Sequence, residues 1–538
     1  MIVDLQRHAA YARLQTLNNV DDRRMSAASS VVRSDIVMLR KAVDNRLSLV
    51  PREQHSLLGR FAKQASDNWK DAKESSVHQL SADVARYAGK VTTAFQKSVA
   101  RTYSAQIEKL DAVGPSASSS LEIGRQVQAS SITSTLASRR AEIAARATRY
   151  ETAAPAIASL LASQIDLLNR DAVERGFPNA AAQKYADLGT SSSLLGATLL
   201  SFEAEAPAYQ RYQRLLRDHA KKKLGLSDIK ATDLAMSNAA MPLLSLDEAS
   251  TLILDALAPL GSDFQQRMRR LLDPANGRLG LSGGTHRSTA SGTVIAVYDA
   301  PLAVYMGNFQ GTLKQVATLA HEGGHAIHRG IMNESGLATY QRNGPAYMFE
   351  AHGILNDLLL LNHVAETAKS PTHRIAALEA FLDKIVLEVF GSAQETAFER
   401  ALYEAQSGNT MLQRSDIDKL YQAAISPYEI WPMSEVGTSQ AWMLKTHVFD
   451  DPLYYTNYLY SGLSAFTLFT KIKEDPAFAP RYEALLHRGF DAPADVLLAS
   501  VDINLNDPSL LKNAIKIFSK KTEELRKLYI EVGELDAN

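Results

Sequence analysis

Apolar side chains recur every three to four residues along most of this chain, which is the spacing of one helix face. The pattern covers residues 1 to about 110, continues through alanine-rich segments at about 121–175 and 178–225, and dominates again from residue 346 onward. Residues 507–509 are expected to open the last helix, with Pro508 in its first turn, and the helix is expected to continue to about residue 532. The patterning therefore predicts a mainly α-helical fold.

One stretch in the middle of the chain breaks the helical pattern. Residues 293–298 and 302–306 are rich in β-branched and aromatic side chains and predict a small antiparallel β element. A glycine-rich segment, residues 276–292, comes before it. Its glycines lack the spacing of a phosphate-binding loop, and we expect a mobile loop there. A long helix should begin near Thr312, directly after the β element.

Composition limits the class of protein. The chain has 538 residues, of which 46% are hydrophobic and 22% charged, and its net charge is −1. This balance is typical of globular proteins and gives no overall field that would favour nucleic acid or an anionic membrane. The first residues lack the basic segment and apolar run of a signal peptide, and no apolar run is long enough to span a bilayer. We expect a cytoplasmic protein without a nucleic-acid or membrane partner.

The segment His321-Glu322-Gly323-Gly324-His325 carries the most specific chemical signal. Helical residues four apart lie on the same face, so His321 and His325 can direct two imidazole nitrogens at one Zn²⁺ ion. Glu322 follows the first histidine, where its carboxylate can reach an activated water and act as a general base. The pattern predicts metal-assisted hydrolysis.

Two histidines leave a catalytic zinc site incomplete. The chain has no cysteine, so any further ligand must be a histidine or a carboxylate. Glu350 opens an apolar-periodic segment after the motif and can deliver a carboxylate from a second helix. With His321 and His325 it would leave the open fourth position that catalysis needs. We expect one Zn²⁺ per chain, although such a site could also accept Mn²⁺ or Co²⁺.

Two further segments add to the signal of this motif. Residues 318–328 form an extended version of the zinc motif, and residues 447–460 contain a histidine followed by a cluster of tyrosines. With the position of Glu350, these features resemble the thimet oligopeptidase and oligoendopeptidase F family of zinc peptidases. The resemblance is strong from about residue 210 to 530 and looks closest to the oligoendopeptidase F branch.

The resemblance implies a mainly α fold, a helical ellipsoid of two helical domains that flank a deep substrate channel. The metal would lie near the floor of that channel. We expect an N-terminal helical domain at residues 1–210 and the zinc peptidase domain at residues 211–538. The resemblance also implies that Asp357 supports a metal-binding histidine.

The resulting hypothesis is a zinc-dependent oligopeptidase that hydrolyses internal bonds of short peptides. Glu322 would take the proton of the attacking water. The resemblance implies that a phenol from Tyr455 or Tyr458 stabilises the oxyanion, and that His447 donates to the oxyanion or to the substrate backbone. Residues 302–308 could pair with the substrate as an added strand.

Other functional classes stay open. A catalytically silent peptide-binding protein of the same fold would need a broken ligand set, whereas here the set is intact. A zinc exopeptidase, such as a carboxydipeptidase, would share the site and differ in product lengths. A helical partner-binding protein with an accidental motif would bind no stoichiometric zinc. The tyrosines could be core aromatics, and the chain could be a monomer or a dimer.

Some conspicuous residues have plainer interpretations. His328 is expected to pack or to support the site, because the ligand set is complete without it. His352 is expected to be a neutral packed histidine, with substrate contact as the alternative, and His286 is expected to have no site role. The lysines of residues 221–223 fit a solvated helix end. Gly323 adds a second glycine to the motif helix, at a cost of up to about 1 kcal/mol relative to alanine.

Overall fold

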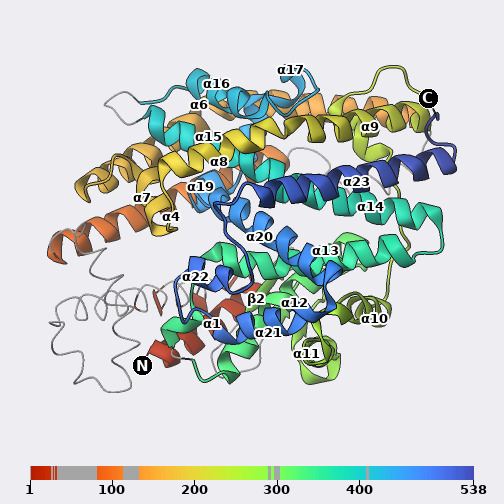
Figure 1. The fold of residues 1–538 in the computed structure, drawn as a ribbon. Coiled ribbons are helices and arrows are strands. Elements are labelled where there is room, and N and C mark those ends of the chain that lie inside the picture. The colour runs from red at the N-terminus through yellow and green to blue at the C-terminus, as the bar shows by residue number, and fades with distance from the viewer. Residues whose placement is uncertain are drawn as a thin grey trace. The chain divides into compact units, whose positions relative to one another are not determined.

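The computed structural model describes most of the chain. It covers residues 2–22, single positions between 24 and 35, and residues 82–112, 132–288, 292–295, 303–337, 339–406 and 411–537. Parts of several predictions lie outside the described residues: the helices expected over 36–81 and 121–131, residues 289–291 of the expected mobile loop, and residues 296–298 and 302 of the two expected strands. The described chain is mostly helical with one small sheet, so the predicted mainly α fold is confirmed (Figure 1).

The chain folds into two compact units, each assembled from separate stretches. The first unit contains residues 1–79, 241–369 and 460–507. Its helices and strands are α1 (Ile2–Asn18), α10 (Leu246–Ala256), α11 (Ser262–Leu272), β1 (Leu279–Gly280), β2 (Thr293–Ile295), β3 (Ala303–Tyr305), α12 (Leu313–Glu334), α13 (Ala346–Thr367), most of α20 (Tyr455–Glu474), α21 (Ala479–Arg488) and α22 (Ala494–Ala499), with short 3₁₀ turns η3 (Ala258–Leu260), η4 (Pro274–Asn276), η5 (Thr339–Arg342) and η7 (Pro476–Phe478).

The second unit contains residues 80–240, 370–459 and 508–538. Its helices are α4 (Ala82–Ala112), α6 (Ile132–Glu174), α7 (Ala180–Asp187), α8 (Ser192–Ala204), α9 (Ala206–Leu224), α14 (Pro371–Ile385), α15 (Ser392–Ala405), α16 (Arg414–Ile425), α17 (Met433–Val436), α18 (Ser439–Met443), α19 (His447–Asp450) and α23 (Ser509–Glu531), with the 3₁₀ turn η2 (Ala231–Met236) and the π-helical turn η6 (Val386–Gly391). The first turn of α20 also groups with this unit.

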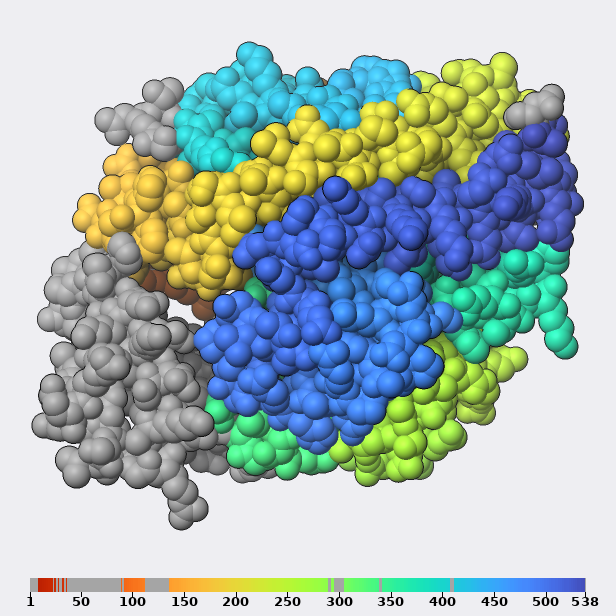
Figure 2. All heavy atoms as spheres, in the orientation of Figure 1, coloured from red at the N-terminus to blue at the C-terminus, as the bar shows by residue number. Residues whose placement is uncertain are grey.

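The units interleave along the sequence because helices from distant parts of the chain pack together. In the second unit, α23 packs on α14 and on α9. Figure 2 shows α9 (yellow to yellow-green) and α23 (dark blue) side by side on one face. A single cut at residue 210 does not reproduce this grouping. The division into domains at 1–210 and 211–538 stays a prediction about where the catalytic part begins.

Local sequence signals position several helix ends as expected. Thr312 is the N-cap of α12, where its side chain accepts from the backbone N–H of Gln315. Gly225 follows α9 with φ 67°, the left-handed conformation that suits glycine at a C-cap. Pro508 takes the N-cap position of α23, one residue before the first turn in which we expected it.

The lysine cluster at the end of α9 has a structural role in the second unit. Lys223 pairs with Glu534 at 3.1 Å, and Lys222 pairs with Asp536. The buried His219 hydrogen-bonds Glu534 at 2.8 Å. These contacts fix the segment after α23 against α9, so the lysines serve a packing contact that the interpretation as a solvated helix end did not include.

The sheet of the first unit has the order β1-β3-β2. β2 and β3 pair antiparallel, as predicted for the β element. β1 adds a parallel partner on the other side of β3, and its two residues were too short a run to predict. The expectation that residues 302–308 receive a substrate strand is therefore wrong for residues 303–305, because β3 is central and both of its edges are paired.

No helix among the described residues combines the length and the apolar character that crossing a membrane requires.

Candidate active site

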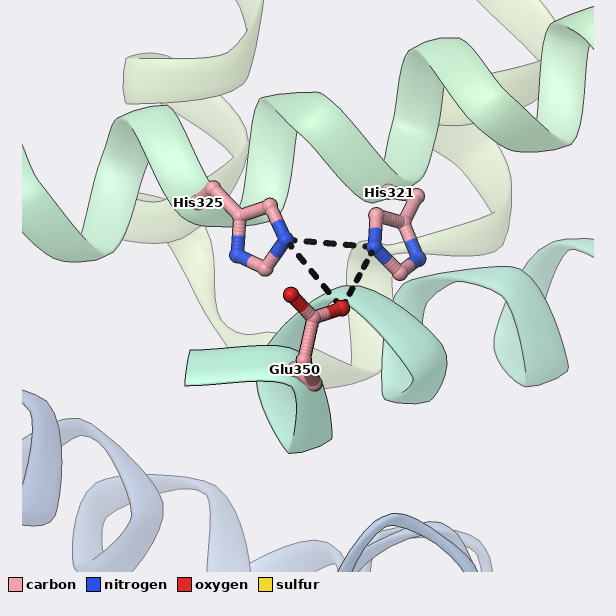
Figure 3. Close-up of side chains that lie close together, drawn as sticks. All are labelled: His321, His325 and Glu350. Atoms are coloured by element: carbon pink, nitrogen blue, oxygen red, sulfur yellow. Dashed lines mark hydrogen bonds and ion pairs between the residues drawn. The ribbon is translucent and has the colours of Figure 1, made fainter. Parts of the chain in front are cut away.

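Two helices of the first unit bring the predicted metal ligands together. His321 and His325 project from α12, and Glu350 projects from the first turns of α13 (Figure 3). The Nε2 atoms of His321 and His325 lie 3.1 Å apart. Oε2 of Glu350 lies 3.5 Å from Nε2 of His321 and 3.8 Å from Nε2 of His325. Three donor atoms from residues up to 29 positions apart thus converge on one point.

This geometry fits a zinc ion. In a tetrahedral site with bonds of about 2.0–2.1 Å, neighbouring ligand atoms lie roughly 3.3–3.4 Å apart. The three observed separations, from 3.1 to 3.8 Å, bracket that value. Burial lowers the pKa of His325 to about 4, which keeps its imidazole neutral and available as a ligand. The donor set is therefore suited to a divalent cation.

Asp357 orients the first histidine. Its Oδ2 lies 2.9 Å from Nδ1 of His321, and the carboxylate is almost fully buried one to two turns beyond Glu350 on α13. A proton held on Nδ1 by this contact leaves the lone pair of Nε2 directed at the metal position. The structure thus places Asp357 where the supporting role implied by the resemblance requires it.

Glycines allow the two site helices to approach closely. A Cβ atom on Gly353 would lie 2.5 Å from Nε2 of His321, and one on Gly324 would lie 2.6 Å from the side-chain nitrogen of Asn356. That nitrogen donates to the carbonyl of Ala320 at 3.0 Å and ties the helices together. The second motif glycine, Gly323, makes room for α11 in the same way. Close packing offsets the helix propensity that these glycines cost.

Replacing Gly353 with alanine is expected to weaken zinc binding about tenfold, because the added methyl group must push the His321 ring from its position. Zinc affinity, measured by competition with a chromogenic chelator, checks this. Thr367→Ala, an exposed position at the end of the same helix, is the matched control. Unchanged affinity in Gly353→Ala would show that the His321 ring can move without loss of the metal.

Glu322 lies on α12, beside the three candidate metal ligands. Burial raises the pKa of its carboxyl to about 7, while the neighbouring His321 lowers that pKa and Glu350 raises it. Gly292, just before β2, leaves no room for a side chain beside this carboxylate, because a Cβ there would lie 2.9 Å from Oε1 of Glu322. A carboxyl with a pKa near neutrality can both accept and return a proton.

The two other histidines near the site are packed in the interior. His328 and His352 are both buried, and their rings meet edge to face with centroids 4.4 Å apart. Nδ1 of His352 lies 3.1 Å from the hydroxyl of Tyr482, and burial lowers the pKa of His352 to about 3. The expected neutral, packed histidines are thus found. His286 is exposed and pairs with Asp21 at 2.7 Å.

The predicted histidine–tyrosine cluster forms in the second unit. The ring of His447 in α19 lies 5.5 Å from that of Tyr455 and 5.8 Å from that of Tyr458, centroid to centroid. Tyr454 completes the cluster at 5.0 Å from His447. Burial raises the pKa of Tyr455, and nearby carboxylates raise it further. Its phenol therefore stays protonated and can donate a hydrogen bond.

One residue that supports this cluster had no signal in the sequence. Glu399 of α15 is buried and accepts a hydrogen bond from the backbone N–H of Leu453 at 2.6 Å. Leu453 has φ 64°, a conformation that a branched side chain adopts only where its surroundings impose it. The glutamate thus fixes the turn between α19 and α20, from which the cluster is built.

Comparison with known proteins finds similarity to peptidases. Residues 272–517 match the model of peptidase family M3. The chromosomal oligoendopeptidase F of Lactococcus lactis subsp. cremoris is 25% identical over 408 residues, covering 73% of this chain and 64% of the relative. The match therefore spans slightly less than two thirds of that relative's length.

Solved structures share the fold. Oligoendopeptidase-F from Enterococcus faecium superposes with a TM-score of 0.69 at 18% identity, covering 98% of this chain and 91% of that one. PZ peptidase A, solved with an inhibitor, gives a TM-score of 0.72 at 16% identity, covering 95% and 89%. Residues 272–517 of this chain are thus similar to peptidase family M3. The relatives with oligoendopeptidase F names bear out the resemblance to that branch.

Proposed function

We propose that this protein is a zinc-dependent oligopeptidase that cleaves internal bonds of short peptides. The observation that carries the proposal is the convergence of His321, His325 and Glu350 on one point, with Glu322 beside them. The match of residues 272–517 to the model of peptidase family M3 and the oligoendopeptidase F relatives support the same reaction class. One Zn²⁺ ion would be held per chain by these three ligands.

The chain's own residues carry out the proton transfers. A bound zinc ion would supply a Lewis acid and lower the pKa of a water molecule toward neutrality. Glu322 takes the proton from the attacking water and returns it to the leaving amine, for which a carboxyl pKa of about 7 is well matched. Asp357 holds His321 in the required tautomer throughout.

An edge strand offers a way to hold a peptide. β2 pairs only with β3 among the described strands, and Gly292 just before it lies close enough to the carboxylate of Glu322 to exclude a side chain. A substrate that pairs with β2 would be held through its backbone, close to the general base, with little dependence on its side chains. Short peptides without a fixed fold are thus the proposed substrates, and the cytoplasm is the proposed location.

The aromatic cluster of the second unit is proposed to stabilise the oxyanion. Replacing Tyr455 or Tyr458 with phenylalanine removes one phenol donor, and the more important of the two is expected to lower kcat about 10²-fold with little change in KM. Steady-state kinetics on one defined peptide checks this. His447→Ala should show a loss in the same range.

Tyr454→Phe is the matched control, because its ring belongs to the same cluster and carries no proposed role. It should keep kcat within twofold of the parent. Equal activity in all three phenylalanine variants would remove the tyrosines from the mechanism and leave them as packing residues.

The length of the products separates the proposed function from its alternatives. Peptides of about ten residues are incubated with the zinc-loaded protein, and mass spectrometry identifies every fragment. Cuts at internal bonds support the endopeptidase. Successive release of C-terminal dipeptides would instead identify a carboxydipeptidase. Tight peptide binding without fragments would identify a catalytically silent binding protein.

A further inference from the structure

The N-terminal helix α1 docks on the small sheet of the first unit. The carbonyl of Leu17, in the last turn of α1, accepts hydrogen bonds from the backbone N–H of Ser288 at 2.8 Å and from the hydroxyl of Tyr305 at 3.0 Å. The backbone N–H of Val20 donates to the carbonyl of His286 at 2.9 Å. A helix end whose free carbonyls are satisfied by such distant residues is fixed in position.

Arg13 extends this docking to the edge strand. It lies one turn before Leu17 on the same face of α1. Its Nη2 donates to the side-chain oxygen of Thr293, the first residue of β2, at 2.6 Å. The two residues are 280 positions apart, so the contact forms only in the folded unit.

The strand that Arg13 contacts begins next to the proposed general base. Gly292 immediately precedes Thr293, and a Cβ at Gly292 would lie 2.7 Å from the methyl carbon of Thr318 and 2.9 Å from Oε1 of Glu322. The chain at the start of β2 therefore lies next to the carboxylate, and no side chain would fit in the space that separates the two.

We propose that α1 is part of the catalytic unit, and that Arg13 is a positioning residue which holds β2 against Glu322. The inference rests on the proposed peptidase function and gives the first residues of the chain a role in it. Loss of the Arg13–Thr293 bond frees the start of β2, which displaces both the chain beside the general base and the strand that would receive the substrate. Small displacements of this kind are costly in catalysis.

A double-mutant cycle tests the proposal. Arg13→Ala and Thr293→Val are each expected to lower kcat/KM about tenfold, mostly through kcat. The double variant should lose no more than either single variant, because both remove the same bond. Zinc content and the midpoint of thermal unfolding should match the parent. Arg13→Lys, which keeps a charged donor, should recover part of the loss, and Arg269→Ala, an exposed arginine of α11, should behave as the parent.

Parent-like activity in Arg13→Ala would overturn the proposal, as would losses in the double variant that multiply to about a hundredfold. If Arg13→Ala fails to fold, Thr293→Val against the parent gives the same decision. A parent without peptidase activity would instead remove the proposed function. In that case hydrogen exchange decides the positioning role alone: the amides of β2 and β3 should exchange faster in Arg13→Ala, and unchanged exchange would contradict it.

Discussion

Glu322→Gln is expected to lower kcat about 10³-fold while leaving zinc bound, because the amide keeps the size of the side chain and cannot accept the proton of the attacking water. The three ligand atoms belong to other residues, so the metal content should stay at one ion per chain. Steady-state hydrolysis of a fluorogenic peptide and metal analysis of the same preparation measure both quantities together.

Glu334→Gln is the matched control for this variant. Glu334 is the last residue of the same helix, is exposed, and pairs with Arg267 on the surface, far along α12 from the site. It should keep the activity of the parent. Substantial hydrolysis by Glu322→Gln would assign the general base to another residue and would remove the central step of the mechanism.

Loss of a ligand is expected to abolish both metal binding and activity. His325→Ala removes one of the three converging donors and leaves two, which cannot hold zinc at catalytic affinity. The effect on stability is also predictable. Zinc at about one hundred times its dissociation constant should stabilise the parent by about 2.7 kcal/mol and should not stabilise His325→Ala. Denaturant unfolding with and without zinc measures this difference.

Replacement of Asp357, the carboxylate that supports His321, should weaken zinc binding without abolishing it. Asp357→Asn keeps the shape of the side chain and weakens the contact to Nδ1 of His321, so zinc affinity should fall about 10–100-fold. His363→Ala, on the same helix α13, should bind zinc as the parent does.

Full zinc affinity in His325→Ala would show that the metal is held elsewhere.

The core of the candidate site was predictable because it depends on residues that are close together in the sequence. Residues four apart on a helix share a face whatever the rest of the fold does, so His321 and His325 could be paired from spacing alone. The start of their helix at Thr312 followed from a capping residue, and the end of α9 from Gly225. Glu350 could be added as the third ligand because a second helix was expected to begin near it, after the motif.

Features that depend on distant packing were not predictable in the same way. The contact of Arg13 with Thr293 joins residues 280 positions apart, and neither belongs to a motif. The need for glycine at Gly353 arises from the ring of His321 on another helix. The central place of β3 follows from β1, a strand of two residues that no periodicity could indicate.

The central claim is that metal held by His321, His325 and Glu350 makes this protein a peptidase. Zinc titration of chelator-stripped protein tests it most directly, with cleavage of a quenched peptide of about ten residues followed at each step and the cut sites identified by mass spectrometry. The account predicts that internal cleavage is absent at the start, rises in proportion to bound zinc, and stops rising at one ion per chain. Cleavage by the stripped protein, or one bound ion without any cleavage of a varied set of peptides, would contradict it.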